Sequence, residues 1–260
     1  MGEKTDVNEI CAFWDSQAEK HKANLEATTP DPLAKELELN VLKKYFDTNE
    51  NLLDIGCGNG FNLFSLVDTF RGKMVGVDFA TKMIEAAKRE CEKRTDRERF
   101  AFHEGSVLDD LSYLGQHSQI YTDRCLINLT SDQQHIDALH NLASLLKPGG
   151  KLVLIESTRQ GQEKINSLRE LSGLDSIPYH WHNLYLDENS FLSSIPDGIR
   201  HLETDNFASL YFFMSRVINA KLTPEGQAPD YLSEINKLGA HLPSFGDIAP
   251  LKAFIFQKEK

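Results

Sequence analysis

Apolar residues recur along the chain in two alternating patterns, short continuous runs and stretches with helical spacing. A run at residues 52–55 predicts a buried strand, and the stretch after it has an apolar stripe typical of a helix: Leu63, Phe64, Leu66, Val67 and Phe70. Further strands are predicted at residues 74–77, 100–103, 119–122 and 152–155, with helical stripes between most of them. Strands that alternate with helices predict an α/β fold, with a mostly parallel sheet and helices on both faces.

Two of the helices are marked by their first residues. Asp31 is a suitable N-cap and Pro32 a suitable first helical residue for the stripe that runs to Leu42. Ser131 and Gln134 have the spacing of a capping box before the stripe at residues 136–146. These signals place one helix before the first strand and one before the fifth.

The two ends of the chain follow the strand-helix rhythm less closely. Residues 1–31 form a polar, partly aromatic leader, with Phe13 and Trp14 on a short helix, and we expect this leader to act as a lid. At residues 157–190, glycines and a proline interrupt polar helical turns, which suggests an insertion that caps the site at the mouth of the sheet. Residues 208–214 and 251–256 are apolar runs that we predict to be two late strands. Residues 32–260 would then form one domain.

Composition narrows the class of protein. A chain of 260 residues with 40% hydrophobic residues is long enough for one large α/β domain. No stretch approaches the roughly 18 apolar residues of a membrane span, and the first residues lack the apolar core of a secretory signal. The net charge of -11 makes nucleic acid an unlikely partner, because such binding requires a cationic surface. Four scattered cysteines without a C-x-x-C pair predict reduced thiols in a cytoplasmic protein.

The chemistry is most visible after the first predicted strand, where Asp54 is followed by Gly56, Gly58 and Gly60. Glycine permits positive φ and lets a ligand lie against bare backbone. The helix that follows offers free backbone N–H groups at its start. These features predict a nucleotide-like ligand. The G-x-G-x-G spacing differs from the G-x-G-x-x-G of dinucleotide-binding turns, so a nicotinamide-dependent oxidoreductase is a weak alternative.

The motif at residues 54–60, D-I-G-C-G-N-G, resembles the first motif of the class I S-adenosylmethionine (SAM)-dependent methyltransferases. Residues 74–78 resemble the second strand of that family and the acid at its end, and residues 146–154 resemble its L-K-P-G-G turn and fifth strand. The resemblance covers roughly residues 33–156. It implies a Rossmann-like, doubly wound sheet of seven strands, with the late strands antiparallel at one edge, and SAM as the cofactor.

The resemblance implies cofactor contacts for nine residues: Asp54, Gly56, Gly58, Gly60, Asp78, Phe79, Ser106, Val107 and Arg124. Asp54 would help to hold the methionine amino end, and Asp78 would accept both ribose hydroxyls, because a carboxylate offers two acceptor oxygens. Ser106 stands where the family usually has an acid, and it would bond the adenine amino group. The alternatives are a structural turn for Asp54, core packing for Phe79 and an ordinary salt bridge for Arg124.

The acceptor side of the site is less clearly marked. The candidate catalytic residues are His182, the leading general base, with His180 and Glu156. Histidine titrates near neutral pH and is the commonest proton-transfer group. The candidate substrate-binding residues are Asn128, Arg159, Trp181, Asn183 and Tyr185. The alternatives are a solvated strand end for Glu156 and plain packing for the stretch at residues 179–185. His180 and His182 also have a spacing that suits metal ligands, but no third ligand is evident and we predict no metal site.

The segments 124–129 and 181–188 resemble those of bacterial small-molecule methyltransferases, some of them linked to saccharide or other specialised biosynthesis. We therefore expect a SAM-dependent methyltransferase that acts on O or N of a small polar metabolite, with no membrane partner and an unspecified oligomeric state. Two alternatives remain. One is an enzyme that transfers a different group from a sulfonium cofactor, and the other is a non-catalytic SAM-binding protein that acts through a partner.

Overall fold

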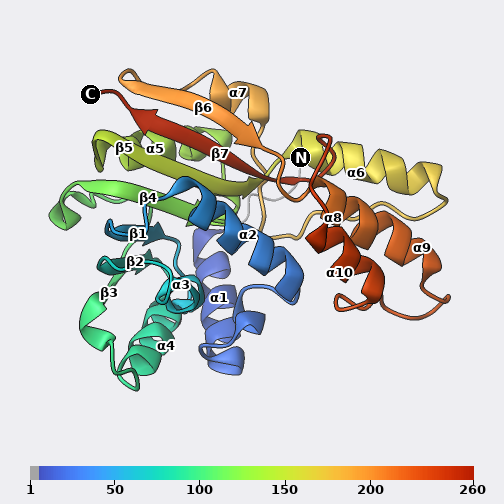
Figure 1. Ribbon diagram of the computed structural model, residues 1–260, viewed down its shortest axis with the longest axis horizontal. Coiled ribbons are helices and arrows are strands. Elements are labelled where there is room, and N and C mark those ends of the chain that lie inside the picture. Colours follow the sequence, from blue (N-terminus) through green and yellow to red (C-terminus); the bar gives the residue numbers. More distant parts are fainter. Residues whose placement is uncertain (1–5) are drawn as a thin grey trace.

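The computed structural model describes residues 6–260, so the first five residues of the expected leader lie outside the described part. The described chain contains a seven-stranded sheet in the order β3-β2-β1-β4-β5-β7-β6 (Figure 1). Its strands are β1 (Leu52–Ile55), β2 (Met74–Asp78), β3 (Phe100–Glu104), β4 (His117–Asp123), β5 (Leu146–Ser157), β6 (Ile199–Asp205) and β7 (Leu251–Lys258). The strands β1 to β5 pair with one another in parallel, and β7 is antiparallel to both β5 and β6. This order and the antiparallel edge confirm the expected Rossmann-like fold.

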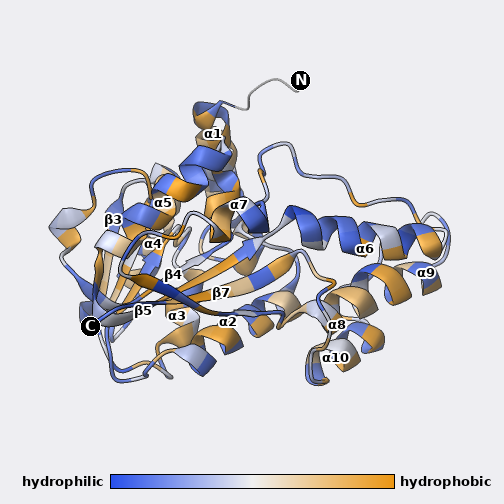
Figure 2. Cartoon of the chain, turned by 90° about the horizontal axis from the view of Figure 1, so that it is seen from above, coloured by the Kyte–Doolittle hydropathy of each residue, from blue (hydrophilic) through white to orange (hydrophobic). Residues whose placement is uncertain are grey.

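Helices cover both faces of the sheet because successive strand residues point to opposite sides. On one face, Leu52 and Ile155 pack with α2 (Pro32–Tyr45), α3 (Phe61–Leu66) and α4 (Thr81–Cys91). On the other face, Leu53 and Leu154 pack with α5 (Asp132–Ser144) and α7 (Glu188–Leu192). Figure 2 shows hydrophobic residues concentrated along the central strands. The two apolar clusters hold the carboxyl ends of β1, β2 and β4 in fixed positions.

The N-terminal leader forms α1 (Val7–His21), which is longer than the short helix expected. Asp15 Oδ1 accepts a hydrogen bond of 2.8 Å from the backbone N–H of Lys82, at the start of α4. The side-chain amide of Asn59 donates to the carbonyl oxygens of Lys22 and Asn24, both at 2.8 Å. These contacts attach α1 to the start of α4, and the segment after α1 to the turn between β1 and α3.

The apolar run at residues 208–214 is helical, and the strand predicted there is wrong. It forms α8 (Ser209–Phe213), which continues into a π-helical turn (Met214–Asn219) and α9 (Ala220–Leu222). A continuous apolar run does not distinguish a strand from a buried helix. The strand beside β7 is instead β6, which lies at the outer edge of the sheet. Edge residues such as Leu202 and Glu203 are exposed, so β6 has no continuous apolar run that would have predicted a strand.

α6 (Arg159–Leu171) is one uninterrupted helix, so the expected break at Gly161 is also wrong. Gly161 lies in the first turn of α6, where an added Cβ would be 2.2 Å from the carbonyl oxygen of Ala249. The glycine therefore serves close packing of α6 against the segment before β7. Gly173, with φ +68°, follows the end of the helix.

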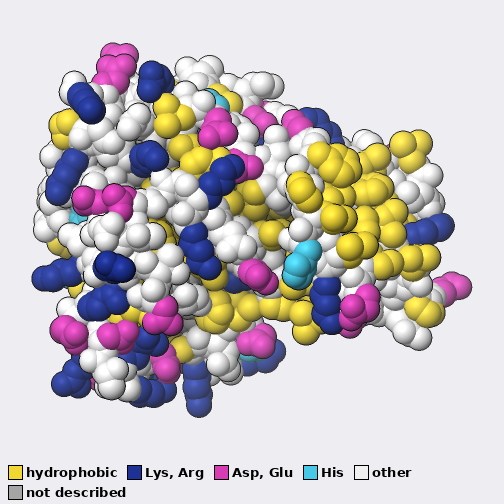
Figure 3. Space-filling view, viewed as in Figure 1, with side chains coloured by type: hydrophobic (Ala, Val, Ile, Leu, Met, Phe, Trp, Pro, Cys, Tyr) yellow, Lys and Arg dark blue, Asp and Glu magenta, His cyan; other side chains and the backbone are white. Residues whose placement is uncertain are grey.

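A helical lobe extends from one end of the sheet, formed by α6, α8, α9 and α10 (Glu234–His241) (Figure 1). Hydrophobic side chains gather on its surface (Figure 3), and the exposed ones include Leu222, Leu238 and Phe245. None of the helices in residues 6–260 is long and apolar enough to cross a membrane.

Candidate functional site

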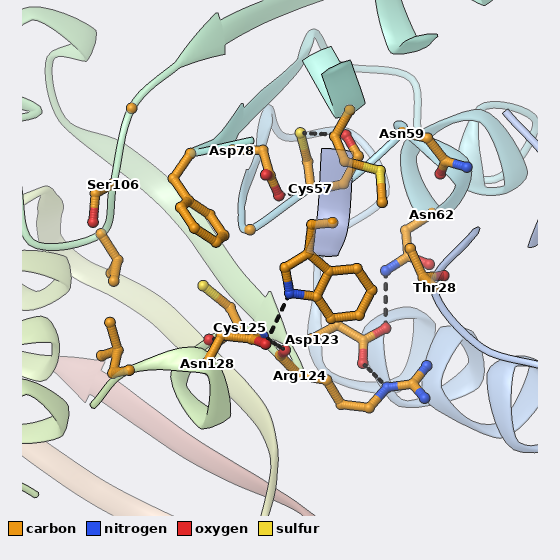
Figure 4. Close-up of a pocket in the computed structure, with 18 of the residues that line it drawn as sticks. Thr28, Cys57, Asn59, Asn62, Asp78, Ser106, Asp123, Arg124, Cys125 and Asn128 are labelled. Atoms are coloured by element: carbon orange, nitrogen blue, oxygen red, sulfur yellow. Dashed lines mark hydrogen bonds and ion pairs between the residues drawn. The ribbon is translucent and has the colours of Figure 1, made fainter. Parts of the chain in front are cut away.

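Two adjoining cavities lie at the carboxyl ends of the parallel strands, where the strand order reverses between β1 and β4. Ligands of open α/β sheets bind at such a reversal. The first cavity is lined by the glycine turn, the ends of β2 and β4 and the loop after β3; its residues include 56–59, 78–79, 105–108 and 123–125 (Figure 4). The second cavity, of about 450 Å³, lies between residues 13–31, α2, the segment 177–185 and the helical lobe.

Hydrogen bonds to β2 fix the glycine turn. The N–H groups of Gly56 and Cys57 donate to the carbonyl oxygen of Val77, at 2.7 and 3.0 Å. Gly56 has φ +81°, and an added Cβ would be 2.5 Å from the Cys125 side chain. Gly58 has φ +53° and lines the first cavity. Gly60, with φ +79°, is the N-cap of α3 and is absent from the described lining of both cavities.

Asp54 lies behind the turn and lines neither cavity. Its Oδ2 accepts a hydrogen bond of 2.6 Å from the Tyr121 hydroxyl, and within the described residues its buried Oδ1 has no hydrogen-bond partner. Burial raises the pKa of Asp54 well above its usual range, although the Tyr121 hydrogen bond opposes this rise. The geometry supports a role in fixing β1 to β4 and leaves the contact with a methionine amino end as a prediction.

Asp78 is at the end of β2 and lines the first cavity. Its Oδ2 accepts from the Gly58 N–H at 2.8 Å and its Oδ1 from the Ala80 N–H at 2.9 Å. Burial raises the pKa of Asp78 to about 6 despite these two hydrogen bonds. Each oxygen keeps a further lone pair, so the carboxylate is able to accept two more donors from a ligand.

The other residues predicted to contact adenosine lie beside Asp78. Phe79, Ser106 and Val107 line the first cavity. In Figure 4, Asp78 and Ser106 lie on the side opposite Thr28 and Asn62. The first cavity is thus elongated, with a carboxylate and a hydroxyl toward one end and amide and hydroxyl groups at the other.

A buried cluster of charges separates the two cavities. The Lys35 ammonium contacts Asp123 and lies 2.6 Å from Glu38 Oε2, and Arg124 donates to the same Glu38 oxygen at 3.0 Å. Asn62 Nδ2 donates to Asp123 Oδ2 at 2.9 Å. The pKa of Asp123 falls to about 2 because of Lys35 and Arg124, which outweigh its burial. Burial raises the pKa of Glu38 to about 7.

Sequence reasoning found Arg124 but missed Lys35, Glu38 and Asp123. Lys35 and Glu38 lie on the inner side of α2, and both are almost completely buried. The available signal was their position, since Glu38 precedes Leu42 by four residues and Lys35 precedes it by seven. Charged residues that share a helix face with an apolar stripe indicate a buried polar site.

Trp14, Thr28 and Arg124 line both cavities and define their junction. The Trp14 Nε1–H donates to Asn128 Oδ1 at 2.9 Å, and Asn128 Nδ2 donates to the carbonyl oxygen of Arg124 at 2.9 Å. Asn128, predicted to bind substrate, therefore uses its amide to join α1 to the loop after β4. The two cavities therefore meet at Trp14, Thr28 and Arg124.

An aromatic wall closes one side of the second cavity. The His182 ring stacks on Phe13, with centroids 4.3 Å apart, and lies 5.6 Å from the His180 ring. His180, His182, Asn183 and Tyr185 all line this cavity, so the structure brings four of the predicted acceptor-side residues together. Burial, and secondarily His180, lower the pKa of His182 to about 4. The ring is neutral at pH 7 and is a weak base.

Three other residues predicted for the acceptor side line neither cavity: Glu156, Arg159 and Trp181. Arg159 forms an ion pair with Asp132. Trp181 is 54% exposed and packs edge-on against Phe13 and His182. Their positions give no support to the substrate contacts expected for them, because the ion pair and the edge-on packing engage their side chains outside the cavities.

Glu156 has a structural position instead of the catalytic one expected. It is fully buried, and its Oε1 accepts from the Thr122 hydroxyl at 2.7 Å and from the N–H groups of Cys125 and Leu126, both at 3.1 Å. Burial raises its pKa to about 7. The side chain holds the loop after β4, which carries Arg124 and Asn128, so its effect on the site is indirect.

The helical lobe adds a further charged group that the sequence did not identify. Arg216 lines the second cavity and donates to Asp31 Oδ2 at 2.7 Å, while the Tyr211 hydroxyl donates to Asp31 Oδ1 at 2.6 Å. Asp31 also caps α2 by accepting from the Ala34 N–H at 3.1 Å. The expected N-cap is confirmed, and the same carboxylate joins α2 to the lobe.

The strand order, the glycine turn and the acid at the end of β2 define a class I SAM-dependent methyltransferase fold, and SAM is the cofactor of this class. A family model described as a methyltransferase domain matches residues 46–189, more than half of the chain. The chain belongs to this methyltransferase family.

Individual relatives are distant. The chain is 32% identical over 120 residues to the O-methyltransferase sirM of Leptosphaeria maculans, and this aligned segment covers 42% of the chain and 27% of sirM. It is 30% identical over 113 residues to the demethylmenaquinone methyltransferase of Lactococcus lactis, and that segment covers 43% of each protein. The chain thus spans less than half of the length of these two relatives. The structure of the N-methyltransferase NodS of Bradyrhizobium japonicum, solved with S-adenosylhomocysteine, matches 95% of the chain and 99% of NodS with a TM-score of 0.57 and 15% identity.

Proposed function

We propose that this protein transfers the methyl group of SAM to an oxygen or nitrogen atom of a small molecule held in the second cavity. The observation that carries the proposal is the junction of the two cavities at Trp14, Thr28 and Arg124. A cofactor in the first cavity would present its methyl group at this junction. The second cavity, the larger of the two at about 450 Å³ against about 170 Å³, would hold the acceptor.

The residues of the first cavity fit the cofactor. Asp78 would accept the ribose hydroxyls with the lone pairs that Gly58 and Ala80 leave free. Phe79, Ser106 and Val107 would surround the adenine. The glycine turn would leave room for the cofactor. An added side chain at Gly58 would enter the part of the cavity that Thr28 and Met83 also line.

The opposite end of the first cavity suits an amino acid. Lys35 supplies a cation, and Asp123 supplies an anion whose lowered pKa keeps it ionised at neutral pH. The zwitterionic end of SAM would therefore be held by Lys35, Asp123 and Asn62, with Arg124 between this end and the acceptor. When bound, SAM supplies an activated methyl group on a sulfonium. The protein has to orient the acceptor and, where needed, take up its proton.

The aromatic wall and Asn183 would hold the acceptor, and His182 would shape the pocket without serving as the general base, because its pKa is lowered to about 4. A small polar metabolite of specialised or saccharide-related biosynthesis remains our proposal for the acceptor. The net charge of -11 favours it over a nucleic acid. The four cysteines are free thiols, which supports a cytoplasmic location.

Replacing Asp78 tests the cofactor site. Asp78→Ala should weaken the binding of S-adenosylhomocysteine by about 1.5–3 kcal/mol, the range for hydrogen bonds to a charged group. Isothermal titration calorimetry measures this change. The unmodified protein should bind S-adenosylhomocysteine and should not bind NAD. Tight binding of NAD without binding of S-adenosylhomocysteine would overturn the proposed function.

The pH dependence provides a second measure of the same contact. Ribose hydroxyls donate to the ionised form of Asp78, and protonation removes one acceptor oxygen. Because the pKa of Asp78 in the free protein is about 6, affinity should be full above this pH and should fall as the pH drops through it. The same titration on Asp78→Ala should lack this step.

A further inference from the structure

Three residues that line the second cavity have a buried side-chain nitrogen or oxygen atom without a hydrogen-bond partner in the described chain. These atoms are Glu38 Oε1, His182 Nδ1 and Asn183 Oδ1. Most buried polar atoms of folded proteins are paired, and leaving one unpaired costs about 1–3 kcal/mol. The two oxygens, Glu38 Oε1 and Asn183 Oδ1, are spare acceptors, and they fit a ligand that brings hydrogen-bond donors. Hydroxyl and amine groups are such donors, and they are also nucleophiles for a methyl group.

Glu38 is the member of this set closest to the cofactor side. It contacts Lys35, which lines the first cavity, and Arg124, which lines both cavities. Both cations bind its Oε2, so Oε1 is the oxygen left for a ligand. The side chain is shielded from bulk solvent. A group bound at Oε1 would therefore lie near the junction, out of bulk water.

Glu38 is also the carboxylate of the second cavity that is best suited to take up a proton. Both oxygens of Asp31 are engaged, by Tyr211 and by Arg216. Glu26, the other described acid in the lining, is exposed. The pKa of Glu38, raised to about 7 by burial, is near the pH at which a general base is most effective.

We propose that the methyl acceptor presents an N–H or O–H group to Glu38 Oε1 and that Glu38 takes up its proton during transfer. The acceptor's nitrogen or oxygen forms a bond to the methyl carbon, and the carbon–sulfur bond breaks with its electron pair remaining on sulfur. The proton passes from the acceptor to Glu38, which later releases it to solvent. This inference rests on the proposed function. It narrows the acceptors to hydroxyl and amine compounds.

The test compares Glu38→Gln with the unmodified protein. Benzylamine and phenol serve as probes, because each pairs a donor with a flat body that suits the wall formed by Phe13 and His182. The formation of S-adenosylhomocysteine is measured at saturating SAM. Glu38→Gln should reduce probe-dependent turnover by about 10²–10⁴-fold, the usual contribution of a general base. Glu36→Gln, an exposed neighbour on α2, is the matched control and should leave turnover unchanged.

Two further readouts separate proton uptake from a structural effect. Glu38→Asp keeps a carboxylate and should retain more activity than Glu38→Gln. Turnover of the unmodified protein should rise with pH and level off above about pH 7, and Glu38→Gln should lack this step. The charged groups around Glu38 are Lys35, Asp123 and Arg124, and the pKa of Asp123 is far below this range.

The outcomes distinguish this inference from the function on which it rests. Probe turnover by Glu38→Gln at the rate of the unmodified protein would overturn the role of Glu38. A protein that binds S-adenosylhomocysteine but methylates neither probe would overturn it as well. A protein that does not bind S-adenosylhomocysteine would instead overturn the proposed function.

Discussion

Gly58→Val should abolish the binding of S-adenosylhomocysteine while the protein stays folded. The valine side chain would start 3.2 Å from the Thr28 methyl group and would fill the part of the first cavity where the ligand has to lie against bare backbone. We expect at least a hundredfold loss of affinity, which corresponds to about 2.7 kcal/mol. Titration calorimetry measures the affinity, and circular dichroism reports whether the fold is kept.

The control has to separate this steric effect from backbone strain. Gly58 has φ +53°, which a β-branched residue adopts only with strain. Gly115 has φ +74°, and an added Cβ there meets nothing within 4 Å. Gly115 also has ψ -164°, a conformation essentially restricted to glycine, so Gly115→Val should carry at least as much strain and still keep normal affinity. If Gly58→Val binds S-adenosylhomocysteine as Gly115→Val does, the first cavity is not the cofactor site.

Glu156→Ala should cause the largest loss of stability among these substitutions, about 3–5 kcal/mol in the free energy of unfolding. It removes the acceptor of the Thr122 hydroxyl and of the N–H groups of Cys125 and Leu126, and these donors would stay buried without a partner. Urea unfolding at equilibrium measures the change. Glu156→Gln keeps one acceptor oxygen and should cost much less.

The pKa of Glu156 fixes the sign of its pH dependence. Because folding raises this pKa to about 7, the folded state holds the proton more tightly than the unfolded state does, and the contribution to stability is lost as the pH rises through about 7.

Glu163→Ala, at an exposed position on α6, should change stability by no more than about 0.5 kcal/mol. A catalytic Glu156 would give the reverse pattern, with Glu156→Ala stable but inactive.

The fold and the cofactor side were readable from the sequence because their signals are local. A glycine turn between a strand and a helix, with an acid twenty residues after Gly58, lies within one short stretch of chain. The position of Asp78 beside the glycine turn depends on the pairing of β2 with β1. This pairing is predictable, because two parallel strands place their carboxyl ends at the same edge of the sheet. Short-range patterns were therefore enough to predict the end of the first cavity at Asp78 and Ser106, but not Lys35 and Asp123 at its other end.

The second cavity could not be predicted in the same way, because its residues come from segments far apart in the chain. α1, α2, residues 177–185 and the helical lobe each contribute only a few side chains. The lobe itself was missed, since the apolar run at residues 208–214 suits a strand as well as a buried helix. The position of Glu38 on the apolar face of α2 indicated burial, but only tertiary packing shows that this face borders a cavity.

The central claim is that a cofactor in the first cavity delivers its methyl group to an acceptor in the second. A crystal structure of the protein with S-adenosylhomocysteine tests it most directly. The account predicts the ribose hydroxyls on Asp78, the adenine beside Ser106 and Val107, and the sulfur atom facing the junction formed by Trp14, Thr28 and Arg124. A ligand bound elsewhere, or a sulfur atom that faces away from the second cavity, would contradict the account.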